Sequence, residues 1–189
     1  MSTLKVSTIS PLGTDATKTI TLGESGGTLG IASGAKTSGF GKIGQVVQTI
    51  KTDTQTIGST SYVEIMSVNI TPTNTSSKVL LMWNLQCNGN DHFELSIFRG
   101  TTQIYLGDAS GSRTRNAHSS YAEATNSILS YSGNYLDSPS SSSEQTYYIK
   151  GRSSANASYQ IYVNRSVTDQ DRTENGRTAS DITGMEILD

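Results

Sequence analysis

The stretch Lys78-Val-Leu-Leu-Met-Trp-Asn-Leu-Gln-Cys87 decides the fold class, because apolar residues alternate along its whole length. Side chains of a β-strand point to opposite faces of a sheet with a period of two. The odd-numbered residues from Val79 to Cys87 would therefore form one apolar face, and the even-numbered residues from Leu80 to Gln86 would form the other. We predict that this segment is a central strand with its odd-numbered face in the core.

Eight further segments carry strand signals, namely residues 45–51, 62–70, 93–99, 103–106, 127–131, 146–152, 159–164 and 182–188. Within 62–70, the inward set of Val63 and Ile65 resumes at Val68 and Ile70, and this break of alternation predicts a β-bulge. With three prolines and no helical period, the chain is predicted to be all-β. We expect an antiparallel, jelly-roll-like β-sandwich over residues 44–189.

Residues 1–43 have too few apolar positions to build a core of their own. We expect an extended attachment arm that buries its apolar side chains against another protein, followed by a glycine-rich linker. A flexible Gly/Ser-rich tether is the alternative. The expected virion-attachment residues of the arm are Leu4, Val6, Ile9, Ile20, Leu22, Leu29 and Ile31.

The composition limits the partners of the chain. Hydrophobic residues make up 33% and charged residues 16%, with a formal net charge of −2. Without a basic excess or a long apolar run, neither nucleic acid binding nor a membrane span is expected. The first residues lack the pattern of a secretory signal, so synthesis in a cytoplasm is expected. A small apolar core favours oligomerisation as a source of stability.

Few residues of the chain fit a catalytic or metal site. There are two histidines, His92 and His118, and no Gly-x-Ser-x-Gly sequence that would place a nucleophilic serine. The acidic cluster at Asp169, Asp171 and Glu174 lacks the spacing of a calcium loop. We therefore expect no enzymatic activity, no catalytic residue, no metal ion and no cofactor.

Several segments resemble a family of short structural proteins from marine tailed phages, including those that infect cyanobacteria. The resemblance is carried by residues 1–9, 20–35, 44–53, 70–81, 98–102, 136–139 and 163–169. It implies a C-terminal jelly-roll-like knob, usually homotrimeric, and an N-terminal segment that attaches to other virion proteins. It also implies location in the virion, on either the head or the tail.

Three functions are open at this point. The expected one is a short trimeric fibre or spike, attached to tail or head, that contacts the host surface. The alternative is a capsid decoration or cement protein that stabilises the shell. A bacterial or host-derived adhesive jelly roll outside any virion is the third.

Two groups of residues are expected to make contacts on the knob. The trimer interface is predicted at Leu80, Met82 and Phe98, apolar residues that remain after the core is filled. Tyrosine rings can stack on sugars, so a host glycan or protein receptor is expected at the polar loop 107–125. The predicted receptor contacts there are Arg113, Arg115, His118 and Tyr121.

Overall fold

A computed structural model describes residues 42–121 and 124–188 of the chain. Within them the chain forms eleven strands and no helix. The strands are β1 (Ile43–Lys51), β2 (Gln55–Ile57), β3 (Val63–Ile70), β4 (Lys78–Gly89), β5 (Phe93–Arg99), β6 (Thr102–Ile104), β7 (His118–Ser120), β8 (Leu129–Asp137), β9 (Gln145–Ser153), β10 (Ile161–Val163) and β11 (Ser180–Ile187). The all-β prediction is confirmed, and none of the described residues forms a helix that could cross a membrane.

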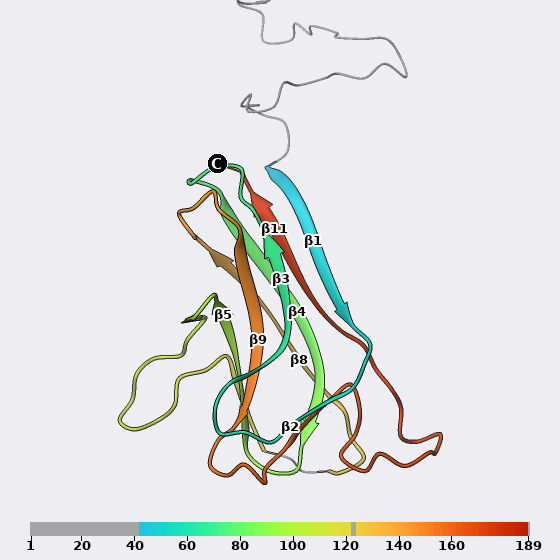
Figure 1. Cartoon of the computed structure of the whole chain (residues 1–189). Coiled ribbons are helices and arrows are strands. Elements are labelled where there is room, and N and C mark those ends of the chain that lie inside the picture. Colours follow the sequence, from blue (N-terminus) through green and yellow to red (C-terminus); the bar gives the residue numbers. More distant parts are fainter. Residues whose placement is uncertain (1–41, 122–123, 189) are drawn as a thin grey trace, which may run out of the picture. The chain divides into compact units, whose positions relative to one another are not determined.

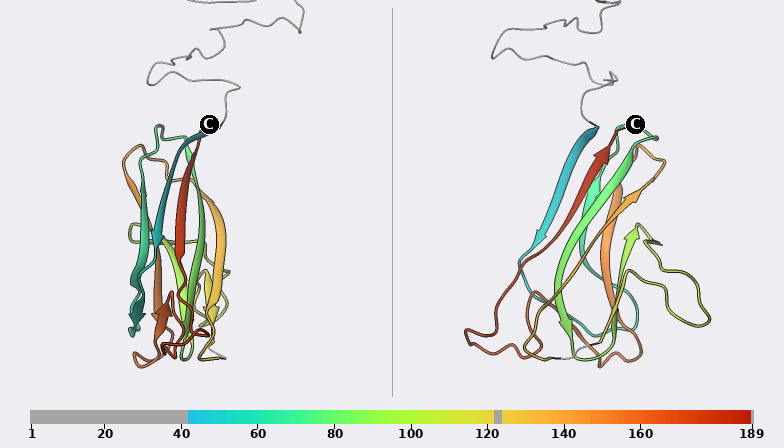
Figure 2. Two further views of the ribbon diagram at one scale, coloured as in Figure 1. Left: turned by 90° about the vertical axis from the view of Figure 1, so that its right-hand side faces the viewer. Right: turned by 180° about the vertical axis from the view of Figure 1, so that it is seen from behind.

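The strands form two antiparallel sheets that face each other as a β-sandwich (Figure 1). In the first sheet the order is β1-β11-β4-β10-β2, and β8 pairs with the other edge of β4. In the second sheet the order is β3-β9-β5-β6, and β7 also pairs with β5. Figure 2 shows β1 and β11 side by side from two further directions, in agreement with their seven-residue register.

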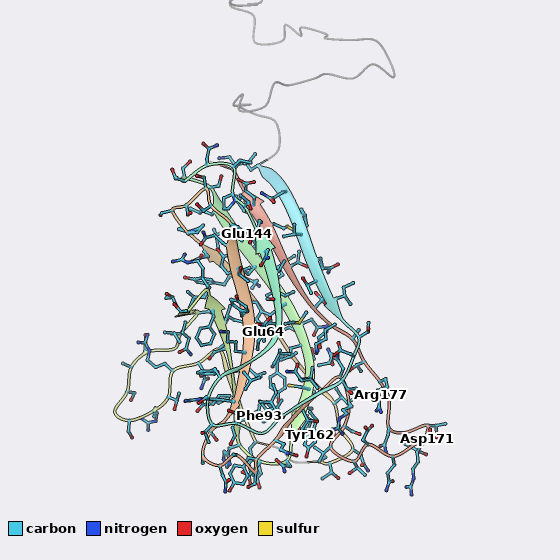
Figure 3. The ribbon with its side chains drawn as sticks, viewed as in Figure 1. Glu64, Phe93, Glu144, Tyr162, Asp171 and Arg177 are labelled. Atoms are coloured by element: carbon cyan, nitrogen blue, oxygen red, sulfur yellow. The ribbon has the colours of Figure 1, made fainter. Side chains whose placement is uncertain are left out.

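Strand β4 lies at the centre of the first sheet, between β11 and β8. The odd-numbered face of the strand lies in the core, as its alternation of apolar residues predicted. Val79, Leu81 and Leu85 on this face have no exposed surface. Trp83 and Cys87 are also buried on this face. The core lies between the sheets, where these side chains meet buried residues of β3, β5 and β9. Phe93, labelled in Figure 3, belongs to this core.

The predicted bulge is present in β3. Its register with β9 shifts between Glu64 and Met66, so that one extra residue is inserted opposite β9. The insertion leaves both Ile65 and Met66 buried, each with 5% of its surface exposed. A strict alternation would have turned one of the two out of the core.

The sandwich begins at Ile43, one residue before the predicted boundary. The predicted attachment arm lies outside the described residues. This holds for Leu4, Val6, Ile9, Ile20, Leu22, Leu29 and Ile31.

Candidate binding site between the sheets

Five ring-bearing residues gather where β8, the edge of the first sheet, approaches β6 and β7 of the second. They are Trp83, Tyr105, His118, Tyr131 and Tyr135. On β8, Tyr131 and Tyr135 lie opposite Leu85 and Leu81 of β4, so both project to the core side of the sheet. We call this group the aromatic edge of the sandwich.

A pocket of about 460 Å³ opens at this edge. Its wall is formed by residues on both sides of the gap between the sheets, from the segment after β6, the segment before β7, and β8. They are Tyr105, Leu106, Gly107, Asn116, Ala117 and Tyr135. None of these residues carries a charge, so the pocket lining is neutral.

Tyr105 holds an unusual backbone conformation at the mouth of the pocket. Its φ is +55°, in the left-handed region that bulky residues rarely adopt. The residue remains 40% exposed while its ring makes an edge contact with Trp83, at a centroid distance of 5.4 Å, and a tilted contact with Tyr135 at 5.7 Å. Strained residues of this kind persist where the surrounding structure holds them, and they concentrate at binding sites.

Asn116 places an unused polar atom in the pocket lining. Its Oδ1 accepts a hydrogen bond from the Ser119 hydroxyl at 3.0 Å. Its Nδ2 is buried and has no hydrogen-bond partner among the described residues. Buried polar groups are nearly always paired, so this amide nitrogen in the wall of the pocket is an exception.

The predicted receptor contact His118 is half-buried in β7 rather than exposed on the loop. It is opposite Leu95 of β5, and its Nε2 accepts a long hydrogen bond of 3.4 Å from Trp83 Nε1. Burial lowers the pKa of His118 below its usual range. The ring is therefore neutral at pH 7, and it supports the wall behind the pocket.

The other predicted receptor contacts are exposed but separated. Arg113 and Arg115 lie on the loop 105–117, which projects from the side of the sandwich in Figure 1. Arg115 Nε donates to the carbonyl of Gly107, and Arg113 bonds to Ser110 within the same loop. Tyr121 is 54% exposed and packs on the ring of His92, 4.5 Å away. The two arginines thus lie on the same loop, whereas His118 lies in β7 and Tyr121 follows β7.

A second candidate surface covers the outer face of the first sheet. Four apolar residues form one row across four paired strands, Val46 opposite Met185, Met185 opposite Leu80, and Leu80 opposite Leu136. Val46 is 53% exposed and Leu136 is 46% exposed. We define the apolar face as this row with its outward-facing neighbours Ile43, Ile50, Met82 and Ile187.

Of the three predicted trimer residues, Leu80 and Met82 lie together on the apolar face. Phe98 lies in β5 of the other sheet. It is 9% exposed, because the ring of Tyr62 packs against it at 5.2 Å and the Lys150 ammonium lies 4.8 Å from its centroid. The three residues therefore do not share one surface.

Residues considered for chemistry have structural partners. Burial raises the pKa of the Cys87 thiol, which keeps the thiol protonated in the core. Asp169 forms ion pairs with Arg165 and Arg177, so its carboxylate is occupied by cations of the chain itself. Figure 3 shows Asp171 and Arg177 on a projecting segment that follows β10. Among the described residues, no group of three or more His, Cys, Asp or Glu side chains has the arrangement of a metal site.

Sequence reasoning located the pocket only in part. The predicted receptor loop 107–125 includes Gly107, Asn116 and Ala117 of the pocket lining, whereas Tyr105, Leu106 and Tyr135 lie outside it. No pattern in the sequence marks a left-handed tyrosine or an amide without a partner. Comparison with known proteins adds no identification, since no family model and no curated protein matches the chain.

Proposed function

We propose that this protein is a non-enzymatic structural protein of a bacteriophage particle, in which the sandwich is the trimeric knob of a short fibre or spike that contacts the host surface. The observation that carries the proposal is the apolar face. Large exposed apolar patches on a folded domain mark interaction surfaces. This one lies on regular, paired strands, so it offers a rigid surface for assembly.

The strand pairing supports a jelly-roll topology for the knob. The short strands β6 and β7 both pair with β5, so we count them as one strand. With the short strands β2 and β10 left out, eight strands remain. The first pairs with the last (β1 with β11), the second with the seventh (β3 with β9), the third with the sixth (β4 with β8), and the fourth with the fifth (β5 with β6 and β7). This nested pairing is what a long hairpin acquires when it wraps into two Greek keys.

Self-association through the apolar face is favoured by its composition. The row from Val46 to Leu136 carries no charge, and neighbouring positions add Ile43 and Ile187. Burial of such residues between subunits would remove apolar surface from water, at about 25 cal/mol per Å². The resemblance to phage fibre proteins is the reason for proposing a trimer. The apolar face is the surface through which the three subunits would associate.

We propose a non-enzymatic role because two of the reactive side chains of the chain are engaged or buried in the structure. The imidazole of His118 is neutral and bonded to Trp83, and the thiol of Cys87 is buried. Neither has a nucleophile or base within the described hydrogen bonds that would complete a catalytic pair.

Host contact is tested with the purified full chain. If the knob binds the host, pre-incubation of cells with the protein reduces phage adsorption in proportion to the sites occupied. Unchanged adsorption at saturating protein contradicts host contact. Electron microscopy of particles that carry a label fused after Asp189 then gives the location, and label on tail structures agrees with a receptor-binding fibre.

A cement protein is the second candidate, because the same apolar face could seat on the capsid shell. The two candidates differ in particle stability. Particles that lack a cement protein release their DNA at a lower temperature, whereas particles that lack a host-contact fibre remain equally heat-stable and lose adsorption. Label distributed over the head lattice also favours the cement function.

A further inference from the structure

We propose that the pocket at the aromatic edge binds one ring of a neutral saccharide. The proposal deepens the host-contact function, to which it assigns a ligand class, and it rests on that function for its biological role. The binding site itself is argued from the geometry of Tyr105, Tyr135 and Asn116.

The size of the pocket fits a small ligand. A volume of about 460 Å³ is within the range of roughly 300–1,000 Å³ that is typical of small-molecule sites. Tyr135 is held by the pairing of β8 with β4. The other five lining residues are at the two ends of the connection 105–117, which leaves β6 and enters β7, and both of these strands pair with β5. A pre-formed site loses little conformational entropy on binding.

The aromatic rings supply the apolar part of the recognition. Sugar rings present a face of C–H groups that packs on tyrosine, while the rim of hydroxyls stays polar. Tyr105 offers such a ring at the mouth, 40% exposed and fixed against Trp83 and Tyr135. The left-handed backbone conformation of Tyr105 destabilises the folded protein. A role in ligand binding would explain why this conformation is kept.

Asn116 supplies the polar part. Asn116 lines the pocket, and its Nδ2 is buried without a partner among the described residues. A rotation of the side chain would let this N–H donate to a sugar hydroxyl oxygen. Gly107 adds backbone atoms to the lining, although its carbonyl already accepts a hydrogen bond from Arg115 Nε. Apolar rings combined with a few fixed polar groups are the usual composition of a small-molecule site.

The neutral lining of the pocket distinguishes neutral sugars from acidic ones. None of the six lining residues is ionisable except through a tyrosine hydroxyl, which is neutral at pH 7. A carboxylated or sulfated sugar would find no cation among the lining residues, and the Arg115 guanidinium beside the pocket is already bonded through Nε to the Gly107 carbonyl. The pocket therefore favours neutral hexoses over acidic ones.

The experiment uses the intrinsic fluorescence of the full chain. Trp83 is the single tryptophan and touches the Tyr105 ring, so its emission reports on the pocket. The probes are the methyl glycosides of glucose, galactose, mannose and N-acetylglucosamine, with methyl glucuronide as the acidic comparison. Saturation-transfer NMR with the same glycosides detects binding independently of fluorescence. A neutral probe of about a dozen heavy atoms should bind with Kd on the order of 1 mM.

Two substitutions test the residues. Tyr105→Asn removes the ring but keeps a residue that tolerates the left-handed region, so the fold is retained. It should raise Kd at least about tenfold through loss of stacking. Asn116→Ala should raise Kd about threefold to tenfold through loss of one hydrogen bond. Tyr148→Ala, which removes a tyrosine of β9 outside the pocket, is the matched control and should leave Kd unchanged.

Failure of the site and failure of the proposed function have different signatures. If no neutral glycoside binds at about 50 mM, far above the expected Kd, or if Tyr105→Asn binds as well as the parent chain, the saccharide site is wrong. If glycosides bind as expected while the protein neither blocks adsorption nor is found on particles, the site stands and the virion function is wrong. If the protein blocks adsorption and the Tyr105→Asn variant blocks it equally, the function stands without this pocket.

Discussion

At the scale of single residues, buried polar groups fasten the ends of the strands to one another. Glu186 of β11 has no exposed surface, and its Oε1 accepts hydrogen bonds from the backbone N–H and the hydroxyl of Thr73, at 2.6 and 2.7 Å. Its Oε2 accepts a bond from Gln45 Nε2 at 3.2 Å. One carboxylate thus joins β1, β11 and the connection between β3 and β4.

The Glu186 carboxylate makes stability depend on pH. Burial alone would raise its pKa, but the hydrogen bonds from Thr73 and Gln45 outweigh burial and hold the pKa below its usual value of 4.5. Because the unfolded chain takes up this proton at a higher pH, the stabilisation is complete above about pH 4.5 and is lost as the pH falls through the lower pKa of the folded state.

Glu186→Gln should therefore lower the free energy of unfolding by about 1–3 kcal/mol at pH 7, because an amide N–H₂ would face the donor of Gln45. Urea denaturation at pH 7 and at pH 3 measures the difference. It should shrink at the lower pH, because protonation of Glu186 in the unfolded parent chain removes part of the advantage of the carboxylate. A difference that stays constant between the two pH values contradicts this role of the carboxylate.

Gly133 is required by the ring that lies over it. It pairs with Trp83 across β4 and β8, and a Cβ atom at this position would overlap the indole. Gly133→Ala should destabilise the protein by about 1–3 kcal/mol through overpacking, and it should shift the Trp83 emission. Gly176→Ala is the control, since a Cβ atom there would meet nothing within 4 Å and its backbone is not left-handed. Equal melting temperatures for the two variants would exclude the predicted overlap.

At the scale of elements, the two sheets are cross-linked at the end of β8. Asp137 Oδ2 accepts a hydrogen bond from Arg99 of β5 and another from the Tyr147 hydroxyl of β9, both at 2.7 Å. Burial, reinforced by the bond to Asp137, raises the pKa of Tyr147. A strand of the first sheet is thereby held to two strands of the second.

Asp137→Asn should cost about 2 kcal/mol of stability, because the Arg99 guanidinium loses its carboxylate in a partly buried place. The matched control is Asp53→Asn, which breaks the pair with Lys51 at a carboxylate that is 73% exposed and should change stability by less than about 0.5 kcal/mol. Chemical denaturation of both variants measures the two costs. A loss at Asp137 no larger than that at Asp53 would show that the cross-link contributes little.

The elements differ in how well their sequences predict them. Strands β3, β4, β5 and β9 begin and end within about two residues of their predicted bounds, because one face of each supplies apolar side chains to the core. Strand β1 does so as well, although most of its apolar residues face outward. Strand β8 was expected at 127–131 and lies at Leu129–Asp137. Its core-side row includes Gly133, which interrupts the apolar alternation, and its outer face is mostly Ser and Asn. Strands β2 and β7 have three residues each, too few for a period to appear.

At the scale of the whole molecule, the apolar face leaves several large apolar side chains of the sandwich exposed. Ile43, Val46 and Ile50 of β1 are each more than half exposed. The sequence identified Leu80 and Met82 as surplus apolar residues, but it could not show that β1, β8 and β11 align theirs beside them. That alignment depends on strand order and register, which arise from tertiary pairing.

Leu80→Asp should dissociate the assembly, because the charge would be placed in the middle of the row formed with Met185 and Leu136. The subunit should remain folded, since the Leu80 side chain points away from the core. Val63→Asp is the control, because Val63 is an exposed apolar residue of the other sheet and should leave the assembly intact. Circular dichroism of both variants verifies the fold.

The most direct measurement is the mass of the full chain in solution by sedimentation equilibrium at micromolar concentration. We expect three times the chain mass for the parent protein and for Val63→Asp, and a single chain mass for Leu80→Asp. A parent protein that sediments as a monomer, or a Leu80→Asp variant that remains trimeric, would contradict the assignment of the apolar face as the surface on which the knob assembles.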